Sequence, residues 1–356
     1  MTTVSNTALY DDCARSLGNQ GAAALSPLRH GTLVITGGTG FVGLWMATLC
    51  AFLNDCHGFN LKLVLTARRY GRLVTAAPHL VGRADLRFVS ADIRQFIEMP
   101  SETSWIIHAA GTPDSRIHLS SPMETMAVIA EGTYRILRVA EQCDNLRMML
   151  HLSSALVYGT QPLDMASLPE DFTGTLNPAA VTSAYAEAKR YSEALCVSAR
   201  SQSRTPLIIT RPFTFLGPFQ SLEAPWALNN FLYSALHNQP LKVLGDGRSV
   251  RSHFYGSDMA FLLLRILSGG RSGGLYNLGH PIGTTLSELA ELVVRVAGVQ
   301  LDIRYNTAGR QIAASRLIPD MTRCHHDFGF TSTFTLTEAI ERTLAWNRRR
   351  QDEVMG

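Results

Sequence analysis

Short apolar runs alternate with longer helical stretches between residue 32 and about residue 215. The runs are rich in Val, Ile and Leu, and they predict strands at 32–36, 61–67, 86–90, 104–110, 147–154 and 206–212. They are continuously apolar rather than alternating, which is typical of strands covered on both faces of a parallel sheet. Helical periodicity lies between several of them, as at 123–143 and 184–201. This order predicts an α/β fold with a Rossmann-type doubly wound parallel sheet.

The pattern changes after residue 215. Segments that contain Pro and Gly mix there with short strands and helices, which predicts a smaller C-terminal α/β domain. We therefore divide the chain into an N-terminal extension (1–30), helical or loose, a dinucleotide-binding domain (31–215) and a mainly substrate-binding domain (216–356).

The stretch from 32 to 54 carries no charge and is long enough to span a bilayer. Four glycines and three threonines occupy its first half, and a short β-branched run is followed by a helical one. We interpret it as a buried strand, a glycine turn and a buried helix. The start of the chain has no basic region followed by an apolar core, so we expect no secretion signal and a cytoplasmic location.

Charge and cysteine content exclude several kinds of partner. The 32 Lys and Arg are scattered among 29 Asp and Glu, and the formal net charge is only +3. We therefore expect neither nucleic acid nor a membrane surface as a partner. The six cysteines lie far apart without C-x-x-C spacing, so we predict free thiols, no disulfide framework and no metal site.

The segment "TLVITGGTGFVGLW" places Gly37, Gly40 and Gly43 directly after a predicted strand, at the start of a helix. The first glycine permits a tight turn, the second lets a pyrophosphate approach the backbone, and the third lets helix and strand pack closely. The helix N-terminus then offers N–H groups to the anion. This context predicts dinucleotide binding.

Other residues of the predicted cofactor site follow the next strands. Arg68 and Arg69 stand where an acid would bind a ribose hydroxyl, which favours NADP over NAD, although a solvated basic turn has the same sequence. After the third strand, Asp92 is expected to accept from the adenine amino group while Ile93 packs on the ring. The predicted cofactor contacts are Gly37, Thr39, Gly40, Phe41, Val42, Arg68, Asp92, Ile93, Ala109 and Ala110.

The segment "SAYAEAK" places Tyr185 and Lys189 four residues apart, on one face of a predicted helix. This spacing also arises by chance. A nearby ammonium stabilises a phenolate, so a lowered pKa of Tyr185 would let it transfer protons nearer neutral pH.

Seven short motifs occur in one order: "TGGTGFVG", "ADI", "IIHAAG", "HLSSALVYG", "SAYAEAK", "RPFTFLGP" and "LGDGRSVRSHFYGSDMA". From about residue 31 to 345 the chain thereby resembles the extended short-chain dehydrogenase/reductases of the nucleotide-sugar epimerase/dehydratase group. The resemblance implies an NAD(P)-binding domain and a domain that binds a nucleoside-diphosphate sugar.

The resemblance also implies a catalytic set. Tyr185 would be the acid/base, Lys189 would hold the nicotinamide ribose, and Ser154 would share the substrate hydroxyl. We choose Ser154 over Ser153 because it directly precedes "ALVYG". Family 4,6-dehydratases usually carry Asp-Glu after this serine. Here those positions are Ala155 and Leu156, which transfer no proton.

An epimerase that acts through a transient 4-keto intermediate is therefore the leading interpretation. A 4-ketoreductase using NADPH and an atypical 4,6-dehydratase, with Glu170 or Asp171 as substitute groups, remain open. A steroid or phenol reductase is disfavoured because the last motif fits a nucleotide-sugar site. A non-catalytic dinucleotide sensor is disfavoured by the intact catalytic set. The resemblance further suggests a role in surface polysaccharide biosynthesis.

For the sugar nucleotide, the resemblance implies that Arg251 binds the diphosphate. Thr214 stands at a common Asn position and Leu216 at a common Tyr position of the family, so the identity of the sugar is open. Asn230 and Arg310 are further substrate contacts, with a helix cap or a surface ion pair as the alternative roles.

The helices at 123–143 and 184–201 match those that pair into a four-helix bundle in family homodimers, and we expect a homodimer. A set of apolar positions on the first helix would either form this interface or face the sheet: Met126, Ile129, Ala130, Tyr134 and Leu137. Ile129 also replaces a frequent family Asn.

Overall fold

The computed structural model describes residues 3–96, 99–203, 205–306 and 314–355. At its centre is a seven-stranded parallel sheet in the order β11-β6-β5-β4-β1-β2-β3. The strands are β1 (Thr32–Thr36), β2 (Lys62–Ala67), β3 (Leu86–Ser90), β4 (Trp105–His108), β5 (Met148–Leu152), β6 (Leu207–Pro212) and β11 (Leu275–Leu278). The strand order reverses beside β1, where α/β sheets bind their ligands. The predicted Rossmann-type fold is confirmed.

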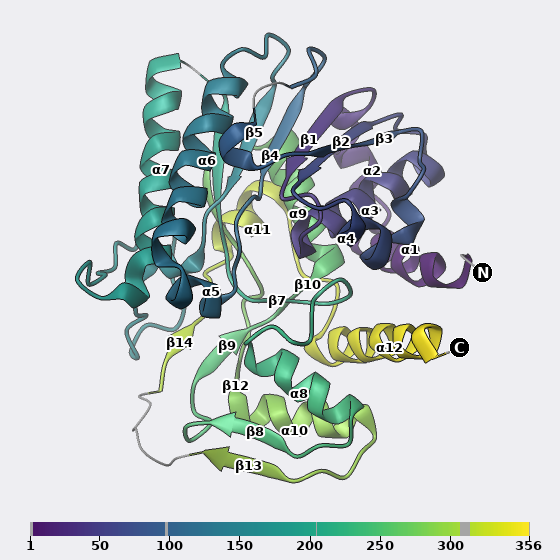
Figure 1. Cartoon of the computed structure of the whole chain (residues 1–356), viewed down its shortest axis with the longest axis vertical. Coiled ribbons are helices and arrows are strands. Elements are labelled where there is room, and N and C mark those ends of the chain that lie inside the picture. Colours follow the sequence, from purple (N-terminus) through teal and green to yellow (C-terminus); the bar gives the residue numbers. More distant parts are fainter. Residues whose placement is uncertain (1–2, 97–98, 204, 307–313, 356) are drawn as a thin grey trace.

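Helices cover both faces of this sheet (Figure 1). On β1, Leu33 and Ile35 face a core formed with α3 (Phe41–His57) and α9 (Gly256–Gly269). Val34, between them, faces the other core, formed with α6 (Pro122–Ala140) and α7 (Ala184–Ser203). Because successive strand residues point to opposite faces, burial on both sides explains the continuous apolar runs.

Short helices connect these elements in the first part of the chain. They are α2 (Gly21–Ala24), α4 (Gly71–Ala76), α5 (Ser115–Ser120) and the 3-10 turns η1 (Ser26–Leu28), η2 (Pro78–Leu80), η3 (Ile93–Gln95), η4 (Ala155–Tyr158) and η5 (Val181–Ser183). The uncharged stretch 32–54 forms β1, the glycine turn and most of α3, as predicted. Across the described residues, no helix combines the length and apolar character needed to cross a bilayer.

A smaller body lies below the sheet in Figure 1. Its helices are α8 (Ala227–Leu236), α10 (Leu286–Ala297) and α12 (Leu336–Met355), whereas α11 (Thr322–Phe328) packs beside α9 and β11 of the large sheet. Its strands are β7 (Phe215–Leu216), β8 (Leu241–Leu244), β9 (Val250–Ser252), β10 (Phe254–Tyr255), β12 (Gly283–Thr285), β13 (Ile303–Asn306) and β14 (Arg316–Leu317), which pair as β12-β9-β14, β13-β8 and β10-β7. Thr285 and Glu288 form a capping box that starts α10.

The chain returns to the large sheet after residue 215. Helix α9 packs on α3, and β11 adds the seventh strand beside β6. The sequence pattern does not predict β11, because its four residues are too few to show a period. The domain division at residue 215 therefore stays a prediction, and the large sheet takes elements from both sides of it.

The N-terminal extension is helical. Helix α1 (Thr3–Leu17) contacts α3 and α9, and its side chains Leu9, Cys13 and Leu17 are buried. Its polar side joins the chain's C-terminal half, where Ser16 Oγ donates to Asp258 Oδ1 at 2.7 Å. The extension is thereby part of the core rather than an appendage.

Asp12 is the buried charge at this junction. It accepts a hydrogen bond of 2.6 Å from the hydroxyl of Tyr255 and pairs with Arg342 of α12. Burial nevertheless raises the pKa of the Asp12 carboxyl to about 6, against the lowering effects of Tyr255 and Arg342. The folded chain thus holds a proton on Asp12 at pH values where the unfolded chain releases it.

We expect this proton to make stability fall as pH rises. The contribution of Asp12 is fully present below its unfolded pKa of 3.8 and is lost as pH passes the folded pKa of about 6. Between about pH 3 and 8, wild type should lose about 3 kcal/mol of unfolding free energy relative to Asp12→Asn. Urea denaturation at several pH values measures this, with the exposed neighbour Asp11→Asn as control. Parallel curves for wild type and Asp12→Asn would contradict the assignment.

Candidate active site

The glycine turn between β1 and α3 is closely packed. Gly37 has φ +70°, and a Cβ built on it would lie 2.6 Å from the carbonyl oxygen of Ala109. A Cβ on Gly43 would lie 2.5 Å from Cα of Gly38. Gly40 is the N-cap of α3, and no side chain caps this helix end. The turn is therefore a bare backbone cradle of the kind that fits a dinucleotide pyrophosphate.

The other predicted cofactor residues lie at the same edge of the sheet. Ala109 and Ala110 follow β4, and their N–H groups donate to the carbonyl and hydroxyl oxygens of Thr36 on β1. Arg68 is exposed at the end of β2, and Asp92 follows β3. Because parallel strands end together, these groups line one edge. The arrangement fits a dinucleotide laid across the strand ends.

Asp92 is held by its neighbours. The guanidinium of Arg94 lies 2.8 Å from the Asp92 carboxylate. Hydrogen bonds from Arg94 lower the pKa of Asp92 to about 2, and the charge of Arg68 makes a smaller contribution in the same direction. Ile93 packs on α6, where a Cβ on Gly132 would lie 2.7 Å from Ile93 Cγ2. Asp92 is therefore a fixed anionic acceptor beside Arg68.

Tyr185 and Lys189 lie on α7, next to the end of β5. Both are buried, and the Lys189 ammonium donates to the carbonyl oxygen of Leu152 at 2.7 Å. Burial lowers the pKa of Lys189 to about 8. The Ser154 side chain lies near the Tyr185 phenol and acts to lower its pKa. The structure thus brings the three predicted catalytic residues to the end of one strand.

The expectation that the pKa of the Tyr185 phenol is lowered is wrong for the protein without a bound ligand. Burial raises the pKa of Tyr185 to about 12, and only the Ser154 hydrogen bond works against it. The reason is that burial disfavours the phenolate, while the Lys189 ammonium is directed to the Leu152 carbonyl. Lowering would require an additional positive charge beside the phenol.

Ser153 and Ser154 occupy different environments. The Ser154 hydroxyl is the cap of η4 and accepts from the N–H of Leu156 at 3.1 Å. The Ser153 hydroxyl is buried and has no hydrogen-bond partner within the described part of the chain. Ala155 is buried, whereas Leu156 is 45% exposed. Of the two positions after Ser154, therefore, only the apolar Leu156 is presented outward.

Two acidic residues of the following loop serve its structure. Glu170 is buried and accepts from the backbone N–H of Asn277 at 2.9 Å, and burial raises its pKa. Asp171 is exposed and pairs with Arg323 at 3.1 Å. Glu170 thus anchors the loop to β11.

The predicted substrate residues lie beyond β6. Arg251 on β9 is half-buried, and its guanidinium donates to the carbonyl and hydroxyl oxygens of Ser315 at 3.0 and 2.8 Å. Thr214 precedes β7, where its carbonyl accepts from Phe254, and Asn230 is exposed on α8. Arg310 lies outside the described residues. Binding of sugar nucleotide by these four positions stays a prediction.

Three histidines near the catalytic residues have no role predicted from the sequence, although His108 and His151 lie within two of the family motifs. His118 of α5 stacks on Tyr185 with ring centroids 4.1 Å apart and 11° between the planes. His108 on β4 and His151 on β5 are buried with ring centroids 5.3 Å apart. Burial first, and then the charge of Lys189, lowers the pKa of His108 to about 3 and moves that of His151 in the same direction. Both are therefore neutral groups beneath the site.

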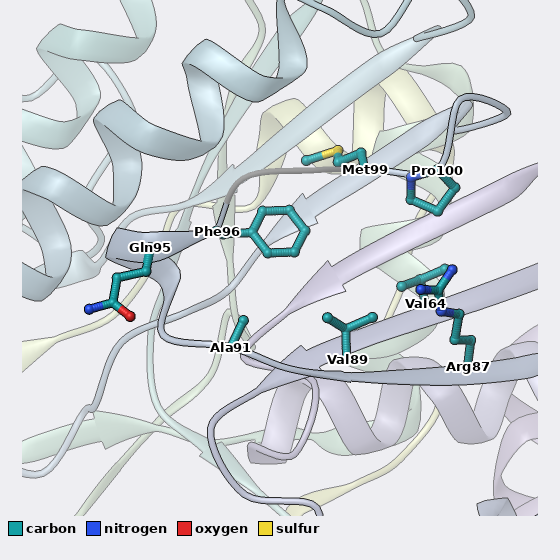
Figure 2. Close-up of a pocket in the computed structure, with 8 residues that line it drawn as sticks. All are labelled: Val64, Arg87, Val89, Ala91, Gln95, Phe96, Met99 and Pro100. Carbon is teal, nitrogen blue, oxygen red and sulfur yellow. The ribbon is translucent and has the colours of Figure 1, made fainter.

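A separate pocket of about 450 Å³ lies beside β2 and β3. Figure 2 shows Phe96 and Met99 facing Val64 and Val89 across it, with Arg87 at its rim. It contains none of the predicted catalytic residues. Among the described residues, no three His, Cys, Asp or Glu side chains are grouped to hold a metal ion.

The fold and the grouping of Ser154, Tyr185 and Lys189 beside a glycine turn define a Rossmann-type short-chain dehydrogenase/reductase. Residues 33–279 match the NAD dependent epimerase/dehydratase family, and the chain belongs to this family. The resemblance drawn from the sequence motifs is confirmed.

Relatives include enzymes of different reactions. The chain is 28% identical over 319 residues to UDP-glucuronic acid decarboxylase 2 of Arabidopsis thaliana, covering 89% of this chain and 68% of that protein. It is 26% identical to dTDP-glucose 4,6-dehydratase of Streptomyces niveus, over 89% of this chain and 92% of that protein. The relatives thus show nucleotide-sugar enzymes as a group without selecting one reaction.

Solved structures show the same fold. An epimerase from Methanothermobacter thermautotrophicus matches with a TM-score of 0.78 at 18% identity, over 95% of this chain and 98% of that one. UDP-glucuronic acid 4-epimerase from Bacillus cereus, in complex with UDP-glucuronic acid and NAD, matches with a TM-score of 0.75 at 18% identity, over 89% and 99% of the two chains.

We expect Gly37→Ala to damage both stability and nucleotide binding. The new Cβ would meet the Ala109 carbonyl at 2.6 Å in a left-handed backbone conformation, which costs about 1–3 kcal/mol. Gly71→Ala is the matched control, because a Cβ there meets nothing within 4 Å. Chemical denaturation and fluorescence titration with NAD and NADP measure the two effects. Equal behaviour of both variants would refute the close-packing argument.

Proposed function

We propose that this protein is an NAD(P)-dependent nucleotide-sugar epimerase that acts through a transient 4-keto intermediate, with Tyr185 as acid/base. The observation that carries the proposal is the grouping of Ser154, after β5, with the buried Tyr185 and Lys189 of α7, beside β4, whose end contacts the bare glycine cradle. A hydroxyl pair at this place suits transfer of one proton at one sugar carbon.

The roles of the side chains follow from their positions. Tyr185 takes the proton of the C4 hydroxyl and returns it, and Ser154 holds the same oxygen by a hydrogen bond. Lys189, fixed by the Leu152 carbonyl, lies one helical turn from Tyr185, where its ammonium binds ribose hydroxyls. A bound NAD(P), held at its ribose by Lys189, would supply a hydride acceptor for C4, a hydride donor for either face of the ketone, and a positive charge that favours the phenolate.

The positions after Ser154 support epimerisation over dehydration. Loss of water across C5 and C6 needs a base for the C5 proton and an acid for the C6 hydroxyl. Ala155 and Leu156 supply neither, and Glu170 is used in holding the loop to Asn277. Epimerisation needs no proton transfer beyond the C4 oxygen, so it fits the groups present.

Decarboxylation of a nucleotide-linked uronic acid is the second candidate, and the decarboxylases among the relatives favour it. Once C4 is a ketone, the C6 carboxylate lies β to it. The C5–C6 bond then breaks with loss of CO₂, and the electron pair passes into an enolate at the C4 oxygen. Ser154 and Tyr185 stabilise that oxygen, and the missing acids are not needed.

We also propose a homodimer through α6 and α7. Of the apolar positions on α6, Met126 and Tyr134 are exposed, whereas Ile129 and Leu137 are buried and face inward. Tyr191 on α7 adds to the exposed apolar surface at 55% exposure. A surface of this kind favours burial against a second copy. A cytoplasmic location is proposed with it.

A panel of nucleotide sugars separates the candidates. Purified protein is incubated with UDP-glucose, UDP-glucuronic acid and dTDP-glucose, with and without NADPH, and products are followed by NMR. We expect a 4-epimer without added reductant. A UDP-pentose with CO₂ would favour the decarboxylase, a product that requires NADPH the ketoreductase, and a 4-keto-6-deoxy sugar would overturn the exclusion of dehydration.

Tyr185→Phe should bind cofactor with unchanged affinity and lose turnover by at least a hundredfold, because it lacks only the hydroxyl. Tyr191→Phe, on the exposed side of the same helix, is the control and should keep full activity. Single-turnover absorbance of the reduced nicotinamide at 340 nm measures the step directly. Retained turnover in Tyr185→Phe would remove Tyr185 from the mechanism.

The proposed preference for NADP rests on Arg68. Its guanidinium stands beside Asp92 at the end of β2, where it would pair with a 2′-phosphate. Arg68→Glu should raise the Kd for NADP about tenfold or more and leave that for NAD within about threefold. Arg72→Glu, exposed on the adjacent α4, controls for general charge. Equal changes in the Kd for NADP and for NAD would show that Arg68 does not recognise the 2′-phosphate.

A further inference from the structure

His118 makes a contact with Tyr185 that the proposed chemistry does not yet use. The imidazole and phenol rings are nearly parallel, with centroids 4.1 Å apart and an interplanar angle of 11°. His118 is 9% exposed, as is Tyr185. The two side chains come from separate elements, α5 and α7, so the contact is tertiary.

The imidazole is itself held in place. Its Nε2 lies 2.7 Å from the carbonyl oxygen of Thr112, which can only accept, so Nε2 carries the proton and donates. The backbone N–H of His118 donates to the carbonyl of Asp114, whose side chain caps α5 by accepting from Arg116 N. These hydrogen bonds therefore fix the plane and the tautomer of the imidazole independently of its stacking contact with Tyr185.

Tyr185 also has apolar neighbours. Ile129 of α6 and Ala188 of α7 form a buried cluster with the phenol, and Ile129 is 2% exposed. Ile129 stands where the family frequently has Asn. An apolar side chain there makes no hydrogen bond that would orient the phenol. Packing against its neighbours must therefore set much of the direction of the phenol.

We propose that His118 is a positioning residue, which holds the phenol of Tyr185 by ring stacking so that its hydroxyl stays directed to Ser154. Rotation of Tyr185 about its Cα–Cβ bond would carry the ring into the fixed imidazole. The stacked pair thus removes the conformers in which the hydroxyl leaves the reacting oxygen. Misplacement of a catalytic group by about 1 Å lowers rates by about 100-fold, so such a restraint is of measurable size.

This inference rests on the proposed role of Tyr185 as acid/base, and it differs from a role of His118 in proton transfer. A stacking role needs an aromatic face but no ring nitrogen. A proton-transfer role needs the nitrogen but no particular face. Phe at position 118 keeps the aromatic face and removes the ring nitrogen, together with its hydrogen bond to Thr112.

The test compares His118→Phe, His118→Leu and His118→Ala with wild type on the sugar nucleotide turned over best in the panel. We expect His118→Phe to keep kcat within about threefold, and the other two to lower kcat about tenfold or more, with KM for sugar and cofactor changed less than about threefold. Leu119→Ala, an exposed neighbour on α5, should match wild type. His118→Leu keeps the buried volume if His118→Ala does not fold, and circular dichroism melts identify that case.

Two outcomes would overturn the inference. If His118→Phe loses as much kcat as His118→Leu, an aromatic face at position 118 does not by itself hold the phenol, and the stacking role is refuted. If His118→Leu retains kcat, Tyr185 needs no restraint from His118. Tyr185→Phe is measured in parallel: its retained turnover refutes the proposed function itself, whereas an inactive Tyr185→Phe beside an unaffected His118→Leu refutes only the stacking role.

Discussion

The close approach of two backbone segments, the glycine turn after β1 and the end of β4, sets the geometry of the whole site. A side chain at Gly37 would reach the Ala109 carbonyl, so the turn tolerates only hydrogen at this position. The same contact brings the amino end of α3 to the point where the strand order reverses. The predicted cofactor residues on β2, β3 and β4 are arranged around that point.

Burial of ionisable groups gives the site its second constraint. Lys189, Tyr185, His108 and His151 lie together at the ends of β4 and β5 with little access to water. The Leu152 carbonyl offsets part of the cost of burying the Lys189 ammonium, and the two histidines are neutral. The phenol is protonated in the chain by itself. The proposed chemistry therefore depends on the positive charge of a bound ligand to stabilise the phenolate. It also depends on catalytic side chains that keep fixed positions before the ligand binds.

The smaller body is tied to the sheet by polar contacts that cross most of the chain. Helix α1 binds Tyr255, Asp258 and Arg342 through Asp12 and Ser16. The contact of Asp12 with Tyr255 anchors β10, which pairs with β7, the strand that follows Thr214.

The sequence by itself determined the parallel sheet, the glycine turn and the Tyr185–Lys189 pair, because each is a local pattern: a continuous apolar run, a glycine spacing, one turn of a helix. It also showed the absence of acids after Ser154, from which the proposed reaction follows. Only the tertiary structure decided the features that join distant segments. These are the addition of β11 to the sheet, the burial of Glu170, the packing of α1 and the stacking of His118 on Tyr185. It also decided the direction in which the pKa of Tyr185 is shifted. Desolvation depends on every element packed around the phenol, and this packing cannot be inferred from the spacing of residues along the chain.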